Sequence, residues 1–464
     1  MFRGKVQQIH FVGIGGAGMS GIAEVLLTMG YRVSGSDLKE SAAVRRLRSL
    51  GGEIHFGHDA SLVDGCDVVV KSTAIPMHNV EIQAAELQQI PVIPRAEMLG
   101  ELMRMKYGVA VAGTHGKTTT TSMLARCLHH AGMDPTIVIG GKLDHIGGSA
   151  RLGAGEFLVA EADESDGSFM KLDPTIAVVT NIDPEHMEHW GTQEALMQGF
   201  ADFANKVPFF GFATLCLDHP NVQRLLPRLN RRVVTYGFSA QAELRGENLS
   251  CKGIETRFDV VWRGTRLGEI NLHMPGRHNV SNALAAIAVG LELGVPFEKL
   301  ADGLDGFTGV DRRFSIRAVI EVEKGRPPIT VIDDYGHHPA EITATLAGAR
   351  EAWPDRRILA VFQPHRFTRV RDLLDDFARA FHDAGHVVVC PVYRAGERPI
   401  EGLDATTIGA RLVSYGHRSV HIVDALEEAT KHLLDEAEPG DVIITLGAGD
   451  VNRVCGELAE GLRG

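Results

Sequence analysis

The sequence lacks paired cysteines and long apolar runs. Its 464 residues include six cysteines scattered without any C-x-x-C pair, so neither a zinc knuckle nor a disulfide framework is indicated. The stretch MFRGKVQQIHFVGIGG has no apolar signal segment, and no run of about eighteen apolar residues occurs anywhere. We therefore expect buried thiols in a reducing compartment, and a cytoplasmic protein that does not cross a membrane.

An excess of positive charge is also absent. Lysine and arginine together number 47 against 59 aspartates and glutamates, which gives a formal net charge of -12. A general nucleic-acid or membrane-surface binder would carry a basic footprint, so we expect neither kind of partner. Anionic ligands must then be held by local clusters of residues. At ~150 residues per domain, the length predicts two to four domains.

A glycine loop joins a strand pattern to a helix pattern in VAVAGTHGKTTTTSML, residues 109–124. Main-chain N–H groups at a helix N-terminus hold anionic oxygens, a lysine neutralises phosphates, and the next hydroxyl can ligate Mg²⁺. The spacing between the glycines is two residues shorter than in the common phosphate loop. A glycine-rich turn with a surface lysine is the alternative interpretation. The candidate nucleotide-binding residues are Gly113, Thr114, His115, Gly116, Lys117, Thr118 and Thr119.

A second glycine pattern, GIGGAGM, follows the first strand pattern. Gly13, Gly15 and Gly18 have G-x-G-x-x-G spacing, and Asp37 ends the next strand pattern. Glycines let the main chain approach a diphosphate, and the acid can accept a hydrogen bond from a ribose hydroxyl. Because any diphosphate fits such a cradle, an NAD(P)-dependent oxidoreductase stays open as a second function. The candidate loop residues are Gly15, Gly16, Ala17 and Gly18.

Strand and helix patterns alternate in three successive blocks, which is typical of parallel α/β architecture. We expect three domains with boundaries at residues 1–106, 107–312 and 313–464. The first and last are predicted to be Rossmann-like. The central domain is predicted to be of the P-loop ATPase type, with a mostly parallel sheet.

Acidic and imidazole side chains follow two apolar strand patterns of the central block. A divalent metal that bridges nucleotide phosphates needs a carboxylate and keeps several waters. A solvated acidic turn and a loop histidine are the ordinary alternatives. The first group is Glu161, Asp163, Glu164 and Asp166, and the second is Asn181, Asp183, His186 and His189.

Polar pairs also occur at predicted helix starts. Asn279 and Asn282 could read the edge of a purine ring, although helix caps are the more ordinary role. Arg366 and Arg369 would share one helical face and could bind a carboxylate or phosphate, or could mark a solvated helix start. The segment VIDDYGHHP and the nearby QPH add Asp333, Asp334, Tyr335, His337, His338 and His365.

The motifs GIGGAGM, GTHGKTTT, EADESD, TNIDPEHM, GRHN, DDYGHHP and QPHRFTR, in this order, resemble those of the bacterial Mur ligases. The resemblance spans nearly the whole chain. GTHGKTTT alone would also fit the folylpolyglutamate synthases of the wider family. The first and the last two motifs are more particular to the branch that adds alanine.

The resemblance implies an ATP-dependent amide ligase of peptidoglycan precursor synthesis, with ATP and Mg²⁺ as cofactors. The implied partners are UDP-N-acetylmuramate and L-alanine, with the protein a monomer or weak homodimer. The implied catalytic residues are Lys117, His186, Arg313 and Asp334, with Arg313, Asp334, Asn279 and Asn282 also at ATP. The metal ligands would be Thr118, Glu161 and His186, and the substrates would meet Gly15 to Gly18, Asp37, Ser72, Thr73, Tyr335, His337, Arg366 and Arg369.

One departure from the family pattern concerns the metal site. Several related ligases that add later residues use a carbamylated lysine shortly after the metal-binding histidine. The stretch HMEHWGTQEALMQGFADF, which begins at His186, contains no lysine. The identity of the group that deprotonates the alanine ammonium also stays open among His337, His338 and His365.

Overall fold

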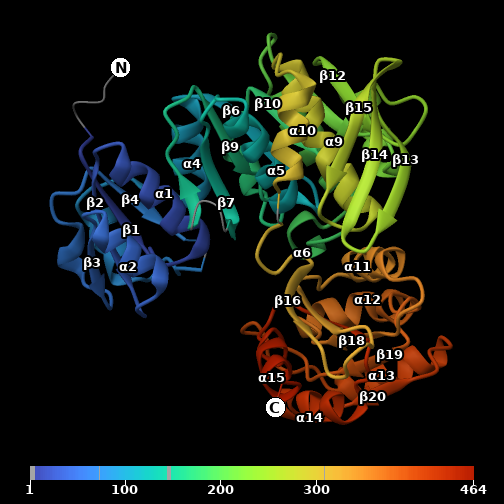
Figure 1. Cartoon of the computed structure of the whole chain (residues 1–464). Coiled ribbons are helices and arrows are strands. Elements are labelled where there is room, and N and C mark those ends of the chain that lie inside the picture. Colours follow the sequence, from blue (N-terminus) through green and yellow to red (C-terminus); the bar gives the residue numbers. More distant parts are fainter. Residues whose placement is uncertain (1–5, 73, 144–147, 308, 464) are drawn as a thin grey trace. The chain divides into compact units, whose positions relative to one another are not determined.

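The structure is a computed structural model that describes residues 6–72, 74–143, 148–307 and 309–463. These described residues form three separate sheets with helices packed against them, mostly with parallel strands (Figure 1). The predicted α/β class is therefore confirmed. By internal contacts the chain divides into two compact units: unit 1 spans residues 1–248, 258–270 and 281–307, and unit 2 spans residues 249–257, 271–280 and 308–464.

The N-terminal sheet is parallel in all its described pairings and has the order β3-β2-β1-β4-β5. The order reverses at β1 and β4, which is where α/β sheets of this kind bind ligands, beyond the carboxyl ends of the strands. The elements are β1 (Gln8–Val12), α1 (Ala17–Thr28), β2 (Arg32–Asp37), α2 (Ala42–Ser49), β3 (Glu53–Phe56), η1 (Ala60–Val63), β4 (Val68–Lys71), α3 (Val80–Leu87), β5 (Val92–Pro94) and α4 (Arg95–Arg104).

The central sheet has the order β15-β14-β13-β12-β11-β10-β6-β9-β7-β8. The strand pairings from β13 to β7 are parallel, and β8 is antiparallel to β7. Helix α7 packs on one face of its middle strands, through Leu196, Phe200 and Phe203. The strands are β6 (Tyr107–Ala112), β7 (Thr136–Leu143), β8 (Gly148–Arg151), β9 (Phe157–Glu161), β10 (Ile176–Val179), β11 (Phe212–Cys216), β12 (Val233–Gly237), β13 (Leu244–Lys252), β14 (Glu255–Trp262) and β15 (Thr265–Leu272), and the helices are α5 (Lys117–His130), η2 (Ser168–Lys171), α6 (Met187–Trp190), α7 (Gln193–Asn205), α8 (Pro220–Leu225), η3 (Leu226–Arg228), α9 (Arg277–Glu292) and α10 (Phe297–Asp305).

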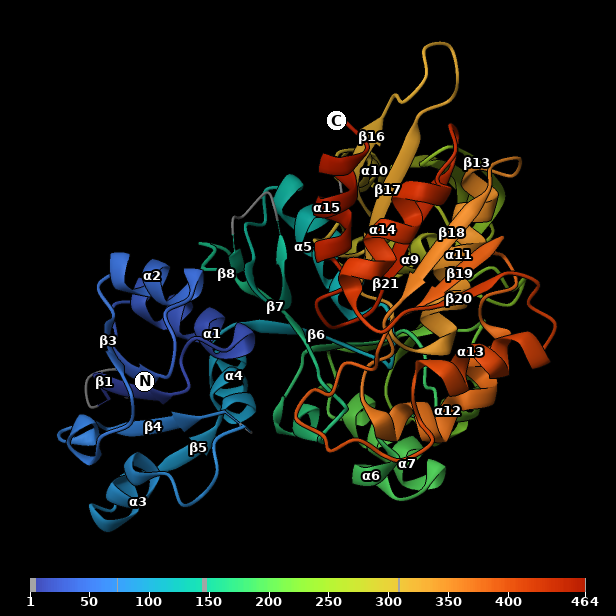
Figure 2. The same ribbon diagram turned by 90° about the horizontal axis from the view of Figure 1, so that it is seen from below.

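The C-terminal sheet has the order β16-β17-β21-β18-β19-β20, in which only the β16 edge pairing is antiparallel among the described strands. Apolar residues of α11, α12 and α13 cover one face, and those of α14 and α15 cover the other (Figure 2). Burial on both faces explains the continuous apolar runs of the strands. The elements are β16 (Ser315–Ile320), β17 (Ile329–Asp334), α11 (Pro339–Ala352), β18 (Ile358–Phe362), α12 (Phe367–Arg379), β19 (His386–Val389), α13 (Ala405–Ser414), β20 (Val420–Ile422), α14 (Leu426–Glu436), β21 (Val442–Leu446) and α15 (Arg453–Gly461).

The cysteine side chains lie mostly inside these cores, as the sequence predicted. Burial raises the pKa of the Cys127, Cys390 and Cys455 thiols to about 12. Cys251, on β13, is partly exposed. As to membranes, none of the helices in the described ranges has the length and apolar character needed to span a bilayer.

Candidate active site

The glycine loop between β6 and α5 has the conformation that an anion cradle needs. Gly113 and Gly116 have φ angles of 134° and 80°, which favour glycine. A Cβ at Gly116 would lie 2.5 Å from Oδ1 of Asn282, so only glycine admits this close amide. The predicted strand, loop and helix are confirmed.

Residues after β10 hold this loop in place. Asn181 accepts a hydrogen bond from His115 N at 2.7 Å and donates one to His115 O at 3.0 Å. The Thr180 hydroxyl donates to the same carbonyl at 2.6 Å. Asp183 N donates to the Thr114 hydroxyl at 2.9 Å. Asn181 and Asp183, which the sequence grouped with possible metal ligands, therefore brace the loop.

Asp183 also lies between two imidazoles. Its carboxylate is 3.3 Å from His115 Nε2 and 3.2 Å from His219 Nε2. Burial favours the protonated acid, but hydrogen bonds from both histidines outweigh burial and hold the pKa of Asp183 far below its usual range. The carboxylate therefore stays charged and fixes the His115 ring of the loop.

Lys117 is partly buried and all its contacts lie within the site, so its interpretation as a free surface lysine is wrong. Its Nζ donates to Gly113 O at 2.6 Å, to Thr114 O at 3.1 Å and to Glu164 Oε2 at 2.8 Å. The Lys117 and Glu164 side chains are 17% and 3% exposed. Burial lowers the pKa of Lys117, but the nearby carboxylates raise it by more, so the ammonium stays charged. A fixed positive charge is thus held beside the loop.

The acidic residues at and after the end of β9 make different contacts. Glu161 ends β9, which pairs with the loop strand β6 through Val111, so this group lies beside the loop. Glu164 binds Lys117, and Trp190 Nε1 donates to Glu164 O at 3.0 Å. Asp166 accepts from Ser168 N within its own turn. For Asp166 the ordinary acidic turn is therefore the better description.

The three predicted metal ligands lie on separate elements. Thr118 is in the first turn of α5, Glu161 ends β9, and His186 precedes α6. His186 lies 3.7 Å from Glu185 and 3.8 Å from Glu188. Over the described ranges, no group of three or more His, Cys, Asp or Glu residues has metal-binding geometry.

The two asparagines at the start of α9 are both buried and both engaged. Asn279 Nδ2 donates to Pro275 O at 2.8 Å, and Asn282 Oδ1 accepts from the Thr120 hydroxyl at 3.1 Å. Asn282 thus contacts the helix that follows the phosphate loop. Its predicted place near the nucleotide agrees with this contact, whereas the adenine role of either residue stays a prediction.

The N-terminal glycine loop is tied to β2. Gly13 N and Ile14 N donate to Ser36 O at 2.9 and 3.0 Å, and Gly15 N donates to Asp37 Oδ2 at 2.8 Å. Asp37 therefore shapes the loop as well as ending the strand. Ser72 follows β4, and a Cβ at Gly13 would lie 3.7 Å from Ser72 Cβ. Thr73 lies outside the described residues.

Arg95 is a cradle residue that the sequence analysis missed. It begins α4, directly after β5 at the edge of the same sheet. Its guanidinium lies where a Cβ on Gly18 would be, so the missing side chain of Gly18 makes room for a cation. The available signal was a lone basic residue at a strand-to-helix junction, PRAEM.

The start of the C-terminal domain places Arg313 and Asp334 together. Asp334 ends β17 and accepts hydrogen bonds from Phe314 N at 2.8 Å and Gly336 N at 2.7 Å. Arg313 Nη1 lies 3.2 Å from Glu341 Oε1, and its guanidinium is 5.2 Å from the Tyr335 ring centre. The two predicted catalytic residues of this domain therefore share one neighbourhood.

Aromatic and imidazole rings form a row beside them. Ring centres are 5.3 Å apart for Tyr335 and His337, and 5.6 Å apart for His337 and His365. Tyr393, which the sequence analysis missed, stacks on His365 at 5.5 Å. Arg369 Nη1 lies 3.3 Å from His365 Nδ1. The structure thus brings the segments after β17 and β18 together, as predicted.

One expectation for this region needs correction, and one candidate base has a structural role as well. Arg366 has a φ angle of 71° and precedes α12, so it does not share a helical face with Arg369. His338 caps α11, where its Nδ1 accepts from Ala340 N in a capping box with Glu341. His337 Nδ1 is likewise engaged, 3.0 Å from Tyr335 O, so the choice among the three candidate bases stays open.

Acid should destabilise the second unit through its neutral histidines. Burial first, and neighbouring cations second, lower the pKa of His278, His365 and His386 to about 4. Unfolded histidine has a pKa of about 6.5, so below that pH the unfolded chain binds more protons and stability is lost as the pH falls toward 4. Melting temperatures should fall less steeply from pH 7 to 5 in His386→Gln than in the parent. His382→Gln, at an exposed histidine, is the control. If the melting temperature falls equally steeply with pH in the parent and in both variants, the buried neutral histidine is not the cause.

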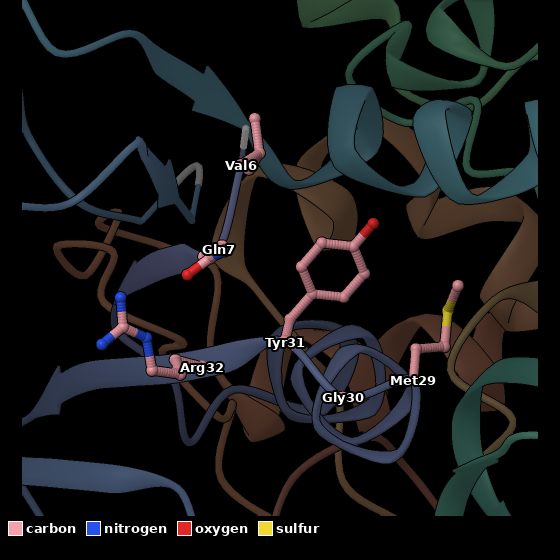
Figure 3. A pocket seen from close by; sticks show the side chains of 6 residues that line it. All are labelled: Val6, Gln7, Met29, Gly30, Tyr31 and Arg32. Atoms are coloured by element: carbon pink, nitrogen blue, oxygen red, sulfur yellow. The ribbon is translucent and has the colours of Figure 1, made fainter. Parts of the chain in front are cut away.

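A cavity of about 390 Å³ lies at the other end of the N-terminal sheet. It is lined by residues at the starts of β1 and β2, and Figure 3 shows the Tyr31 ring between Met29 and the Val6–Gln7 segment. The glycine loop follows the opposite, carboxyl end of β1. We therefore assign this cavity no part in the candidate site.

The chain combines a phosphate loop on a mostly parallel sheet with two Rossmann-like sheets. These features are typical of a nucleotide-dependent α/β enzyme. Three family models match the chain: Mur ligase family, catalytic domain, at residues 8–107, Mur ligase middle domain at 111–290, and Mur ligase, glutamate ligase domain, at 313–449. The chain belongs to the Mur ligase family. The NAD(P)-dependent oxidoreductase interpretation is therefore wrong, because the dinucleotide-like glycine pattern belongs to a ligase.

Curated relatives and a solved structure are similar over nearly the full length. UDP-N-acetylmuramate–L-alanine ligase of Geobacter sulfurreducens is 55% identical over 97% of this chain and 96% of its own. The same-named protein of Syntrophotalea carbinolica is 54% identical over 99% of each chain. The crystal structure of UDP-N-acetylmuramate-alanine ligase from Thermotoga maritima has a TM-score of 0.81 and 32% identity, covering 98% of each chain.

Proposed function

We propose that this chain is the ATP-dependent, ADP-forming ligase that joins L-alanine to UDP-N-acetylmuramate in peptidoglycan precursor synthesis. The observation that carries the proposal is the charged, partly buried Lys117 held in a glycine loop beside the carboxylates of Glu161 and Glu164. The names of relatives at 54% to 55% identity support the choice of substrates.

The proposed reaction has two steps. The lactyl carboxylate of UDP-N-acetylmuramate attacks the γ-phosphorus of ATP, which gives an acyl phosphate and releases ADP. The amine of L-alanine then adds to the acyl carbon, and phosphate leaves as the amide forms. In the first step negative charge shifts toward the β-phosphate, and Lys117 with the N–H groups at the start of α5 would stabilise it.

A magnesium ion fits the residues that flank the loop. The Thr118 hydroxyl and the Glu161 carboxylate are hard oxygen donors on neighbouring elements, as Mg²⁺ prefers, and Mg²⁺ takes its remaining ligands from phosphate and water. His186 would serve a second ion. When bound, the metal supplies neutralisation of phosphate charge.

We assign the binding of the amino acid to aromatic, imidazole and arginine side chains within residues 313–464. Tyr335, His337, Arg366 and Arg369 would receive the substrate carboxylates and the alanine side chain. His365 is neutral at physiological pH because burial lowers its pKa to about 4, so it can accept a proton, although only as a weak base. His337 and His338 are the other candidates for taking the proton of the alanine ammonium.

The proposal also covers the roles of the three domains, the cellular location and the oligomeric state. Residues 1–106 would bind the UDP-sugar, residues 107–312 would bind ATP, and residues 313–464 would bind the amino acid. We propose a cytoplasmic monomer or weak homodimer that binds neither nucleic acid nor membranes. Sedimentation velocity over a hundredfold range of concentration tests the oligomeric state.

The direct test supplies the purified protein with ATP, Mg²⁺, UDP-N-acetylmuramate and one amino acid at a time. Phosphate release and a product mass increased by one alanine residue are expected only when all four are present. Glycine and serine should react more slowly but detectably, because one methyl or hydroxyl is discriminated by only ~1 to 3 kcal/mol in a simple pocket. Phosphate release without any amide product would contradict the proposal.

Glu161→Gln should weaken the response to magnesium. An amide oxygen is a poorer ligand for Mg²⁺ than a carboxylate, so the Mg²⁺ concentration for half-maximal activity should rise by about tenfold or more. Asp166→Asn is the matched control, because Asp166 caps its own turn. If both variants titrate like the parent, Glu161 is not a metal ligand.

A further inference from the structure

A buried polar network lies in the N-terminal domain and is not used by the proposed chemistry. It joins His10 of β1, Ser34 and Ser36 of β2, His58 in the segment after β3, and Glu81 of α3. His10 and Glu81 are both 0% exposed. Residues this polar are rarely buried unless they are paired, and here each finds a partner inside the network.

Glu81 is the centre of this network. Its Oε2 is 2.8 Å from both His10 Nε2 and the Ser36 hydroxyl, and its Oε1 is 2.7 Å from His58 Nδ1. His10 Nδ1 is 2.8 Å from the Ser34 hydroxyl. Burial raises the pKa of Glu81, but hydrogen bonds from His10, Ser36 and His58 lower it by more, so the group stays ionised. An ionised carboxylate only accepts hydrogen bonds, which fixes the hydrogen on His10 Nε2 and on His58 Nδ1.

The network reaches the glycine loop through Ser36. The hydroxyl of Ser36 donates to Glu81, and its carbonyl accepts from Gly13 N and Ile14 N at 2.9 and 3.0 Å. The next residue, Asp37, accepts from Gly15 N. One serine therefore joins the buried carboxylate to the main chain of the loop.

Glu81 also anchors the segment on the other side of the loop. Its own N–H donates to the side chain of Asn79, which caps α3 at the end of the segment that begins with Ser72. The loop after β1 is thus held through Ser36, and the start of α3 is held by Asn79. Apolar residues of the same volume would often stabilise such a core at least as well as a buried charge.

We propose that Glu81 is a positioning residue for the nucleotide-sugar site. By holding Ser36, its carboxylate sets the direction of the loop N–H groups that receive the diphosphate. This inference rests on the proposed function for the identity of the ligand. It assigns Glu81 no contact with the substrate.

The test is Glu81→Gln, compared with Glu86→Gln, the same charge change at an exposed position of the same helix. The glutamine amide cannot accept from all three donors, so the loop should lose its fixed direction. The KM for UDP-N-acetylmuramate should rise by about tenfold or more, while kcat and the KM for ATP and for L-alanine change less than about twofold. The dissociation constant of UDP, measured by calorimetry, should weaken by a similar factor.

A lowered melting temperature with unchanged KM and unchanged UDP binding would make Glu81 purely structural and would overturn the inference. Ser36→Ala keeps the assay informative if Glu81→Gln does not fold, since it removes one hydrogen bond and should raise the same KM about threefold. Unchanged UDP-sugar affinity in Ser36→Ala would also overturn it. Failure of the parent protein to form any amide would instead count against the proposed function, because UDP binding is measured independently.

Discussion

Lys117→Met is expected to lower kcat by about a thousandfold or more, because in the proposed reaction the Lys117 ammonium stabilises the negative charge that develops in phosphoryl transfer. Steady-state kinetics measure this directly. Lys171→Met, at an exposed lysine, is the control and should behave like the parent. Near-normal turnover in Lys117→Met would contradict the assignment of the loop.

Folding must be separated from chemistry in this variant. Glu164 is 3% exposed, and removing one partner of a buried ion pair costs roughly 3–5 kcal/mol when the other stays charged. The double variant Lys117→Met with Glu164→Gln removes both charges, so it should recover melting temperature without recovering kcat. If kcat returned together with stability, the loss would be due to misfolding.

Asp334→Asn should have the second large effect, on stability and activity together. The carboxylate accepts from Phe314 N and Gly336 N, whereas an amide can offer its oxygen to only one of them and turns an N–H group toward the other. Hydrogen bonds to charged groups contribute about 1.5–3 kcal/mol, so thermal denaturation should show a clear loss.

The same change should release the turn that carries Arg313, and kcat/KM should fall by about a hundredfold. Exposed Asp355→Asn is the matched control. A variant Asp334→Asn with the melting temperature and kcat/KM of the parent would show that these two hydrogen bonds do not hold the turn.

Local patterns predicted the loops but not the partners of their side chains. The glycines at 113 and 116 were predictable because the strand, the turn and the helix follow one another along the chain. The choice of Glu164 among four acids as the partner of Lys117 depends on how the turn after β9 folds back, which no local pattern contains. For Arg366 the local pattern was misleading. The pattern predicted a helical residue, but Arg366 has a left-handed φ angle and lies before the helix.

Residues that act at a distance in sequence were missed altogether. Glu81 and His10 are 71 residues apart, and each alone is an ordinary polar residue. Tyr393 enters the ring row only because β18 and β19 are neighbours in the sheet. Such pairs depend on the order of the strands in the sheet. The alternation of strand and helix patterns along the sequence does not specify that order.

The depth of the cysteines has a practical meaning for work with this enzyme. Alkylating reagents and mild oxidants act on the thiolate, and a thiol with a pKa of about 12 is scarcely ionised at neutral pH. Air oxidation should therefore inactivate the protein slowly, and reducing agents should matter little during storage. A maleimide dye should attach first at Cys251, on β13, because its side chain is partly exposed.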